Sequence, residues 1–79
     1  MRQPVTVKYD PVSDTLYIDV CPPYKEQESD LIATGVVARS NPQTGEIETL
    51  EVMHFQKRFE DGKPFELPVS LDMRLPQTA

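Results

Sequence analysis

The segment from Lys8 to Ile18 constrains the fold more than any other, because an acidic, proline-containing turn separates two stretches of alternating residues. Apolar residues recur at every second position from Val5 to Tyr9 and from Leu16 to Val20, which is the period of half-buried strands. Pro11 presets φ for the first corner of a turn, and the Asp10 carboxylate before it can accept backbone N–H bonds. The segment therefore predicts a β-hairpin.

The register of this hairpin follows from its apolar face. Residues directly opposite in an antiparallel pair point to the same side of the sheet, so the two apolar rows must face each other. The predicted pairs are Tyr9 with Leu16, Val7 with Ile18, Val5 with Val20, Lys8 with Tyr17, Thr6 with Asp19, and Asp10 with Thr15 at the loop. Tyr17 then lies on the polar face as an exposed aromatic residue, of the kind that anchors interfaces.

Two further strands are predicted after Cys21-Pro22-Pro23, where successive prolines end the second strand. They run from Leu31 to Ser40 and from Glu46 to Met53. Gly35 marks a weak point, a bulge or a close approach in the middle of the first of them. The four strands together predict a sheet of two hairpins.

The second hairpin has its own turn and a slip in its pattern. Gly45 is free to take the positive φ that the connection needs. Val36 and Ala38 are expected to face the core. A bulge near Glu48-Thr49 would bring the apolar residues on both sides of it to the core, namely Ile47, Leu50 and Val52.

From His54 to Glu60 the spacing becomes that of a helix, because Phe55 and Phe59 stand four positions apart. Gly62 suits the position just after a helix. A helix of about two turns is marginal alone, so both phenylalanines are expected to dock on the sheet. The predicted fold class is α+β: a small antiparallel four-stranded sheet of two hairpins, one short helix and an extended C-terminal arm.

The predicted domain comprises residues 1–62, and the arm comprises residues 63–79. Prolines interrupt the arm and prevent continuous pairing in a central position. Its apolar residues alternate strictly: Phe65, Leu67, Val69, Leu71, Met73 and Leu75. An arm that crosses to a second copy would merge two small cores, so we predict a homodimer held partly by the arm. Packing of the arm onto its own sheet is the alternative.

Composition limits the partners. A chain of 79 residues, 38% of them hydrophobic, forms one domain with a thin core. A formal net charge of −5 opposes binding to nucleic acid or an anionic membrane surface and favours a basic protein partner. No apolar run approaches the roughly 20 residues of a membrane helix. The single Cys21 and an N-terminus without a signal-peptide pattern predict a cytoplasmic protein.

Several segments of the chain form a recognisable set. They are Lys8-Tyr9-Asp10-Pro11, Asp14, Leu16-Tyr17-Ile18, Gly45-Glu46-Ile47, Leu50-Glu51-Val52 and Lys57. From residue 5 to residue 58 the chain resembles a family of short bacterial proteins classed only as a domain of unknown function. The resemblance implies an antiparallel sheet with a helix, and some members are encoded next to toxin-like proteins. Thr49, residues 41–44 and the long arm depart from the family pattern.

Few residues are candidates for a chemical site. Asp10 and Asp14 flank the turn, but a Ca²⁺ loop needs about six oxygen ligands, so turn stabilisation is the favoured role. Glu48 and Glu51 are interpreted as solvated strand residues, because the sequence gives no sign of a raised pKa. His54 is the only histidine and has no partners at metal-site spacing. No catalytic, cofactor-binding or metal-binding residue is therefore predicted.

We predict a non-enzymatic protein-interaction module whose partner is a basic protein, such as a toxin-like protein for which the chain would act as antitoxin. The residues predicted to contact partners are Tyr17, Asp10, Asp14, Glu51 and His54. The alternative is a small hydrolase-like enzyme whose site is built across a dimer interface from Glu51, His54 and Asp14.

Overall fold

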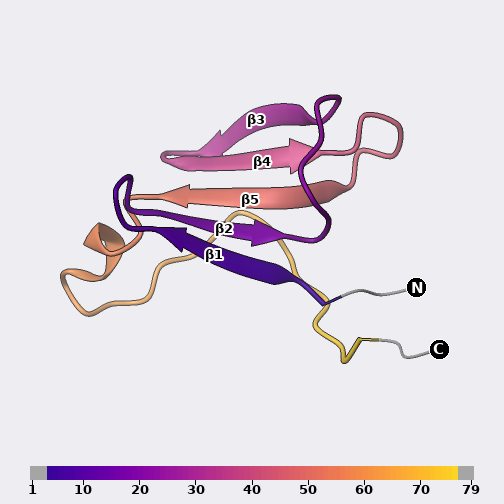
Figure 1. The fold of residues 1–79 in the computed structure, drawn as a ribbon. Helices are drawn as coiled ribbons and strands as arrows, with labels where there is room; N and C mark the ends of the chain where they lie inside the picture. Colours follow the sequence, from indigo (N-terminus) through magenta and orange to yellow (C-terminus); the bar gives the residue numbers. More distant parts are fainter. Residues whose placement is uncertain (1–3, 77–79) are drawn as a thin grey trace.

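The computed structural model describes residues 4–76, which form a five-stranded antiparallel sheet in the order β1-β2-β5-β4-β3 (Figure 1). The strands are β1 (Thr6–Asp10), β2 (Thr15–Asp19), β3 (Glu28–Ala33), β4 (Val36–Ser40) and β5 (Ile47–Met53). Although β5 is the last strand in the sequence, it lies in the centre of the sheet. Its pairing with β2 joins the N-terminal hairpin to the other strands.

The N-terminal hairpin has the predicted register. The pairs within its strands are Tyr9 with Leu16, Val7 with Ile18, Lys8 with Tyr17, Thr6 with Asp19 and Asp10 with Thr15. In the loop, the Asp10 carboxylate accepts hydrogen bonds from the Val12 N–H at 3.0 Å and from the Ser13 hydroxyl at 2.9 Å. These are the bonds by which an aspartate at the start of a turn stabilises it.

The predicted four-stranded sheet is wrong, because the segment assigned to one strand from Leu31 to Ser40 contributes to two. β3 begins earlier, at Glu28, and a turn at Thr34 and Gly35 separates it from β4. Gly35 has a φ of 70°, a left-handed conformation that glycine adopts without strain. The glycine interpreted as a weak point within a strand is therefore where the chain reverses.

Arg58 adds a second reason for glycine at position 35. Its guanidinium donates hydrogen bonds to the carbonyl oxygens of Met53 and Thr34, both at 2.8 Å. A Cβ atom on Gly35 would lie only 2.8 Å from Nη2 of Arg58. The β3-β4 turn is thereby tied to the segment that follows β5.

The predicted helix is also wrong, because residues 54–60 contain only a single 3-10 turn, η1 (Lys57–Phe59). The fold is a sheet with one helical turn and not an α+β domain with a helix. His54 has a φ of 56°, outside the right-handed region that a helix requires, so a helix does not start there. A helix of two turns also forms too few hydrogen bonds to offset the entropy of ordering it.

Residues 54–60 do not form the predicted helix, and contacts between aromatic rings fix their position. The Phe55 ring centroid lies 6.0 Å from that of Tyr9 on β1 and 5.3 Å from that of Phe59. Phe65, from the arm, lies 5.0 Å from Phe59. The predicted docking on the sheet is therefore confirmed for Phe55, although the backbone that presents it is not helical. Phe59, which is 44% exposed, has its ring contacts with Phe55 and Phe65, neither of which belongs to a strand.

The last strand contains the predicted bulge. The register between β4 and β5 shifts so that Glu48 is an extra residue of β5 with no partner opposite. Leu50 and Val52 are buried, as expected. Ile47 was expected in the core and is 43% exposed, because it lies beyond the bulge at the end of the sheet.

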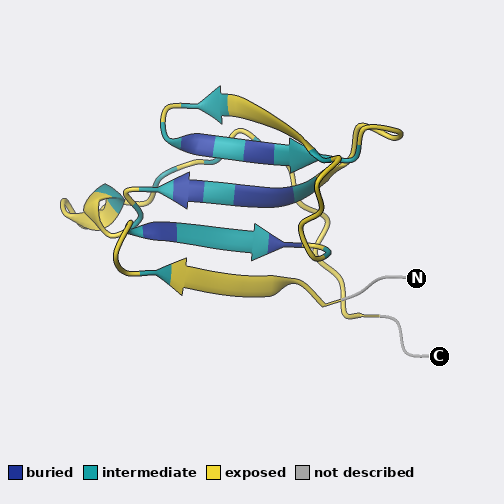
Figure 2. Cartoon of the chain, turned by 45° about the horizontal axis from the view of Figure 1, so that its top comes forward, coloured by how far each residue is buried: buried dark blue, intermediate teal, exposed yellow. Residues whose placement is uncertain are grey.

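One face of the sheet carries the core, and the arm covers it. The buried apolar residues are Val36, Ala38, Leu50 and Val52, on the central strands β4 and β5 (Figure 2). Leu67 and Val69 of the arm pack against this cluster. In the single chain the arm therefore lies on its own sheet, which is the alternative to its crossing to a second copy. Residues 1–3 and 77–79, at the ends of the predicted domain and arm, lie outside the described residues.

The packing of the arm predicts different effects for two similar substitutions. Leu67→Ala is expected to lower the free energy of unfolding by about 1–2 kcal/mol, because a partly buried leucine loses its core contacts. Leu75→Ala, at a position that is 90% exposed, is expected to change it by less than about 0.5 kcal/mol. Urea denaturation of both variants measures the difference, and equal effects would mean that the arm does not cover the core.

Candidate functional site

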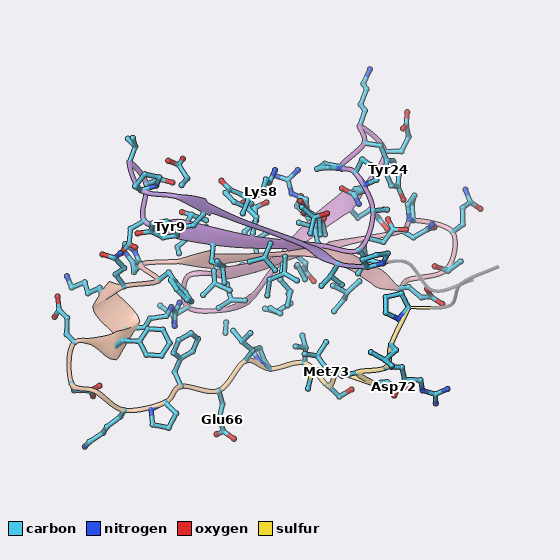
Figure 3. The ribbon with its side chains drawn as sticks, turned by 60° about the horizontal axis from the view of Figure 1, so that its bottom comes forward. Lys8, Tyr9, Tyr24, Glu66, Asp72 and Met73 are labelled. Carbon is cyan, nitrogen blue, oxygen red and sulfur yellow. The ribbon has the colours of Figure 1, made fainter. Side chains whose placement is uncertain are left out.

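No helix or further strand within residues 4–76 covers the face of the sheet opposite the arm. In Figure 3, Lys8 and Tyr24 project on one side of the sheet while the arm, with Glu66, Asp72 and Met73, runs along the other side. We call the side of the sheet that carries Lys8 the open face. The strand registers give its side chains as Thr6, Lys8, Asp10, Thr15, Tyr17, Asp19, Ser29, Leu31, Val37, Arg39, Thr49, Glu51 and Met53.

Tyr17 lies at the middle of the open face and is held from both sides. The Lys8 Nζ atom lies 5.2 Å from the centroid of its ring, in a cation–π contact. On the other side Tyr17 lies opposite Glu51, which accepts a hydrogen bond from Nε of Arg39 at 2.6 Å. Tyr17 was expected to be exposed, and it is half-buried by these neighbours.

A second row of the open face contains buried polar groups. Asp19 and Thr49 lie opposite each other on β2 and β5, and both are buried. The Asp19 Oδ2 atom lies 3.7 Å from Nζ of Lys8, so the buried carboxylate has a partly exposed cation as its partner. Among the described residues, Oδ1 of Asp19 and Oγ1 of Thr49 have no hydrogen-bond partner. Such atoms cost free energy of folding, because they lose their bonds to water.

Two threonines on this face provide a matched test. Thr49→Val is expected to leave the free energy of unfolding unchanged or raise it by up to about 1 kcal/mol, because it removes a buried hydroxyl that has no partner. Thr15→Val is expected to lower it by about 1 kcal/mol, because the buried Thr15 hydroxyl donates to the Ser13 carbonyl at 3.2 Å. Chemical denaturation measures both. A larger loss for Thr49→Val would show that its hydroxyl is bonded in solution.

Glu48, the extra residue of the bulge, is the centre of a hydrogen-bonded cluster at one end of the sheet. Its carboxylate accepts bonds from the Tyr24 hydroxyl at 2.6 Å, from Nε2 of Gln27 at 3.1 Å and from Nδ2 of Asn41 at 3.3 Å. The bond from Tyr24 is the main cause that holds the pKa of Glu48 below its usual range, and it raises the pKa of Tyr24 to about 12. Burial and then the Glu48 carboxylate raise the pKa of the Cys21 thiol, which opposes its ionisation to a nucleophilic thiolate.

Asp14 fastens the opposite end of the sheet. Its Oδ1 atom accepts hydrogen bonds from the Tyr9 hydroxyl at 2.5 Å and from the Gln56 N–H at 3.0 Å. Its carbonyl oxygen accepts a bond from the Phe55 N–H at 2.9 Å. The Tyr9 bond is the main cause that lowers the pKa of Asp14 and raises that of Tyr9 to about 12. Asp14 therefore joins the first turn to the segment after β5.

These carboxylates predict how stability depends on pH. Hydrogen bonds to the ionised form lower the pKa values of Asp10, Asp14 and Glu48 in the folded chain. Their contribution to stability is therefore complete above about pH 5 and is lost as the pH falls through the lowered pKa values, below about pH 4. Urea midpoints at neutral and acid pH are expected to show this loss, and Asp14→Asn is expected to reduce it.

The control for this experiment is Val12→Ala, in the same turn, where the valine is 94% exposed. It is expected to leave the pH dependence unchanged. Tyr9→Phe is expected to act like Asp14→Asn, because it removes the donor that lowers the pKa of Asp14. A pH dependence that is the same in the parent chain and in Asp14→Asn would contradict the assignment.

The five predicted contact residues do not form one site. Tyr17 and Glu51 lie opposite each other on the open face. Asp10 and Asp14 belong to the first turn, and His54 lies close enough to Asp14 to help lower its pKa. Within one chain, the three residues of the hydrolase-like alternative are thus divided between the centre of the open face and the end of the sheet. Residues 4–76 contain no group of three histidine, cysteine, aspartate or glutamate side chains placed to hold a metal ion.

Three charged residues on the open face were not predicted as contact residues. Lys8 and Asp19 were placed on the polar face by the hairpin register, which was a sufficient signal for both. Arg39 was not identified, because its position opposite Thr49 depends on the bulge and on the β4-β5 pairing. In the same way, the slip in alternation at Glu48 was the only sign of the cluster around it.

The model of a family described as a protein of unknown function, DUF2283, matches residues 6–56. The chain belongs to this family. The match runs from the start of β1 to Gln56 and so contains all five strands, whereas the arm lies beyond it. Neither the comparison with curated proteins nor that with solved structures found a match. No helix in residues 4–76 of this DUF2283 chain has the length and apolar character needed to span a membrane.

Proposed function

We propose that this DUF2283 chain is a non-enzymatic protein-interaction module that binds a basic protein through its open face. The observation that supports this most is that no helix or further strand of residues 4–76 covers that face, while the arm packs on the opposite face (Figure 3). A sheet face that is free of other elements offers a broad and rigid surface. A hollow of about 470 Å³, lined by Thr6, Lys8, Asp19 and residues 20–23 among others, lies at one edge of this face. The broad surface beside it suits a protein partner, whereas a small ligand needs a concave site.

The residues in the middle of the open face are of the types that dominate binding energies. Tyrosine and arginine are enriched among interface hot spots. Tyr17 is already held between Lys8 and Glu51, and Arg39 is held by Glu51, so binding would cost little further side-chain entropy. Leu31, which is 67% exposed on the same face, adds apolar area near the edge.

Charge favours a basic partner. The chain carries a formal net charge of −5, and electrostatic complementarity speeds association and excludes acidic competitors. Glu48 adds a carboxylate at the end of the open face whose lowered pKa keeps it ionised at neutral pH. A toxin-like basic protein, for which the chain would be the antitoxin, is the specific form of this proposal.

The test is capture of partners from an extract of the native host, with the full chain as bait. We expect one protein partner at stoichiometric amounts, with retention that weakens as salt rises, because exposed charges are screened. Tyr17→Ala is expected to reduce retention at least tenfold, since truncation of a hot-spot residue typically costs more than about 1.4 kcal/mol.

Leu75→Ala is the matched control, because it truncates a side chain that is 90% exposed in the arm and not on a strand of the open face. It is expected to retain the partner fully. Absence of a stoichiometric partner, or equal retention by Tyr17→Ala and the parent chain, would contradict binding through the open face.

A further inference from the structure

The two edges of the sheet differ in how they are protected. β3 forms one edge, where Glu28 and Asp30 contribute acidic side chains and the register with β4 shifts between Leu31 and Ala33. Charges and irregular register are the usual means by which an edge strand avoids pairing with another chain. β1 forms the other edge, and it pairs with β2 in an unbroken register from Thr6 to Asp10. Its edge is therefore regular and open.

The free hydrogen-bonding groups on this edge can be assigned to residues. The Val20 N–H donates to the Glu48 carbonyl at 2.8 Å, so the backbone of Val20 faces β5. Backbone groups alternate in direction along a strand, so Ile18 also faces β5 while Tyr17 faces β1. The backbone groups of Lys8 and Thr6, which lie opposite Tyr17 and Asp19, therefore bond to β2. The backbone groups of the residues that alternate with them on β1 face outward. The free N–H and C=O groups are those of Val5, Val7 and Tyr9.

Apolar side chains that lack cover gather beside this edge. Val7 is 60% exposed, and Val5 and Val20 are similarly uncovered. Leu71, which is 73% exposed, lines an apolar cavity of about 130 Å³ together with Val5 and Val20. Figure 1 shows that the end of the described arm lies at the corner of the sheet where β1 begins. The exposed Leu71 of the arm thus lies beside the free edge.

The total surface is larger than that of a compact monomer. The chain exposes 6268 Å², whereas a monomer of 9.0 kDa is expected to expose about 4,900 Å². The excess of roughly 1,400 Å² is more than the roughly 800 Å² that each partner buries in an interface of standard size. The exposed surface of the chain is therefore large enough to form an interface of standard size with a second copy.

We propose that two copies of this chain pair their β1 strands antiparallel about a two-fold axis at Val7, which joins the two sheets into one. This register sets Val7 opposite Val7 and Val5 opposite Tyr9 on the core face, and Thr6 opposite Lys8 on the open face. A two-fold axis at Lys8 would set two lysines opposite each other, which is destabilising. The outward Val7 N–H of each copy donates a hydrogen bond to the Val7 carbonyl oxygen of the other copy.

This arrangement has a consequence for binding. Antiparallel pairing at an edge keeps each face of the sheet continuous, so the open faces of the two copies lie on the same side. The ends of the two arms lie on the other side, at opposite ends of the paired β1 strands. A dimer of this kind presents two copies of Tyr17 and Arg39 in one surface, which allows a dimeric partner to bind with higher avidity.

Sedimentation equilibrium of the full chain tests the proposal. The parent chain is expected to have the mass of two chains. Val7→Lys is expected to weaken the dimer on the order of 100-fold, because it replaces two contacting valines with two positive charges that repel each other. Leu31→Lys is the matched control on the β3 edge, where the leucine is 67% exposed, and it is expected to leave the dimer unchanged.

Amide hydrogen exchange keeps the test decisive even if Val7→Lys folds poorly. In the parent dimer the amide of Val7 is expected to exchange slowly, like that of Lys8, which bonds to β2. In a monomer the Val7 amide would exchange rapidly while that of Lys8 stays protected. A monomeric parent chain, a dimer with a rapidly exchanging Val7 amide, or equal dissociation by Val7→Lys and Leu31→Lys would overturn the proposal.

Discussion

The structure depends on the pairing of β2 with β5, because the other strand pairs of the described sheet join neighbours in sequence. Bringing distant strands together costs loop-closure entropy, which the burial of Leu50 and Val52 offsets. Both ends of this pairing are fastened by a carboxylate. Glu48 binds Tyr24 from the long connection after β2, and Asp14 binds the backbone after β5. The carboxylates of Glu48 and Asp14, which were candidates for a chemical site in the sequence, therefore stabilise the fold.

The arm explains how so small a core is covered. The apolar face of the sheet has no helix within the described residues, and an extended segment takes its place. Pro64 and Pro68 lack backbone donors, so the arm crosses the strands and does not join the sheet as a sixth strand. A single extended segment is narrow, so Leu67 and Val69 cover the centre of the face while the edge near Val7 stays open.

Features that depend on residues close in sequence could be predicted, whereas features that depend on contacts between distant residues could not. The register of the β1-β2 hairpin was predicted correctly from Thr6 to Asp10, because it is determined by local alternation and by its own turn. β3 was not recognised, because Glu28 to Leu31 are exposed on an edge strand and show no apolar alternation. The helix was predicted wrongly, because the Phe55 N–H donates to the carbonyl oxygen of Asp14 in the distant first turn and His54 has a positive φ. Arg39 was missed as a contact residue for the same reason, since its partner Glu51 lies on another strand beyond a bulge.

The open face and the β1 edge would recognise partners by different physical means. At the edge, affinity comes from backbone hydrogen bonds and apolar contacts, which are insensitive to salt and available to any regular strand. On the open face the charges are already paired within the chain, as Arg39 is with Glu51, so a partner must compete with internal ion pairs. Such competition penalises partners that do not match the charge pattern. The edge is therefore suited to permanent assembly with an identical chain, and the open face to selection of a different one.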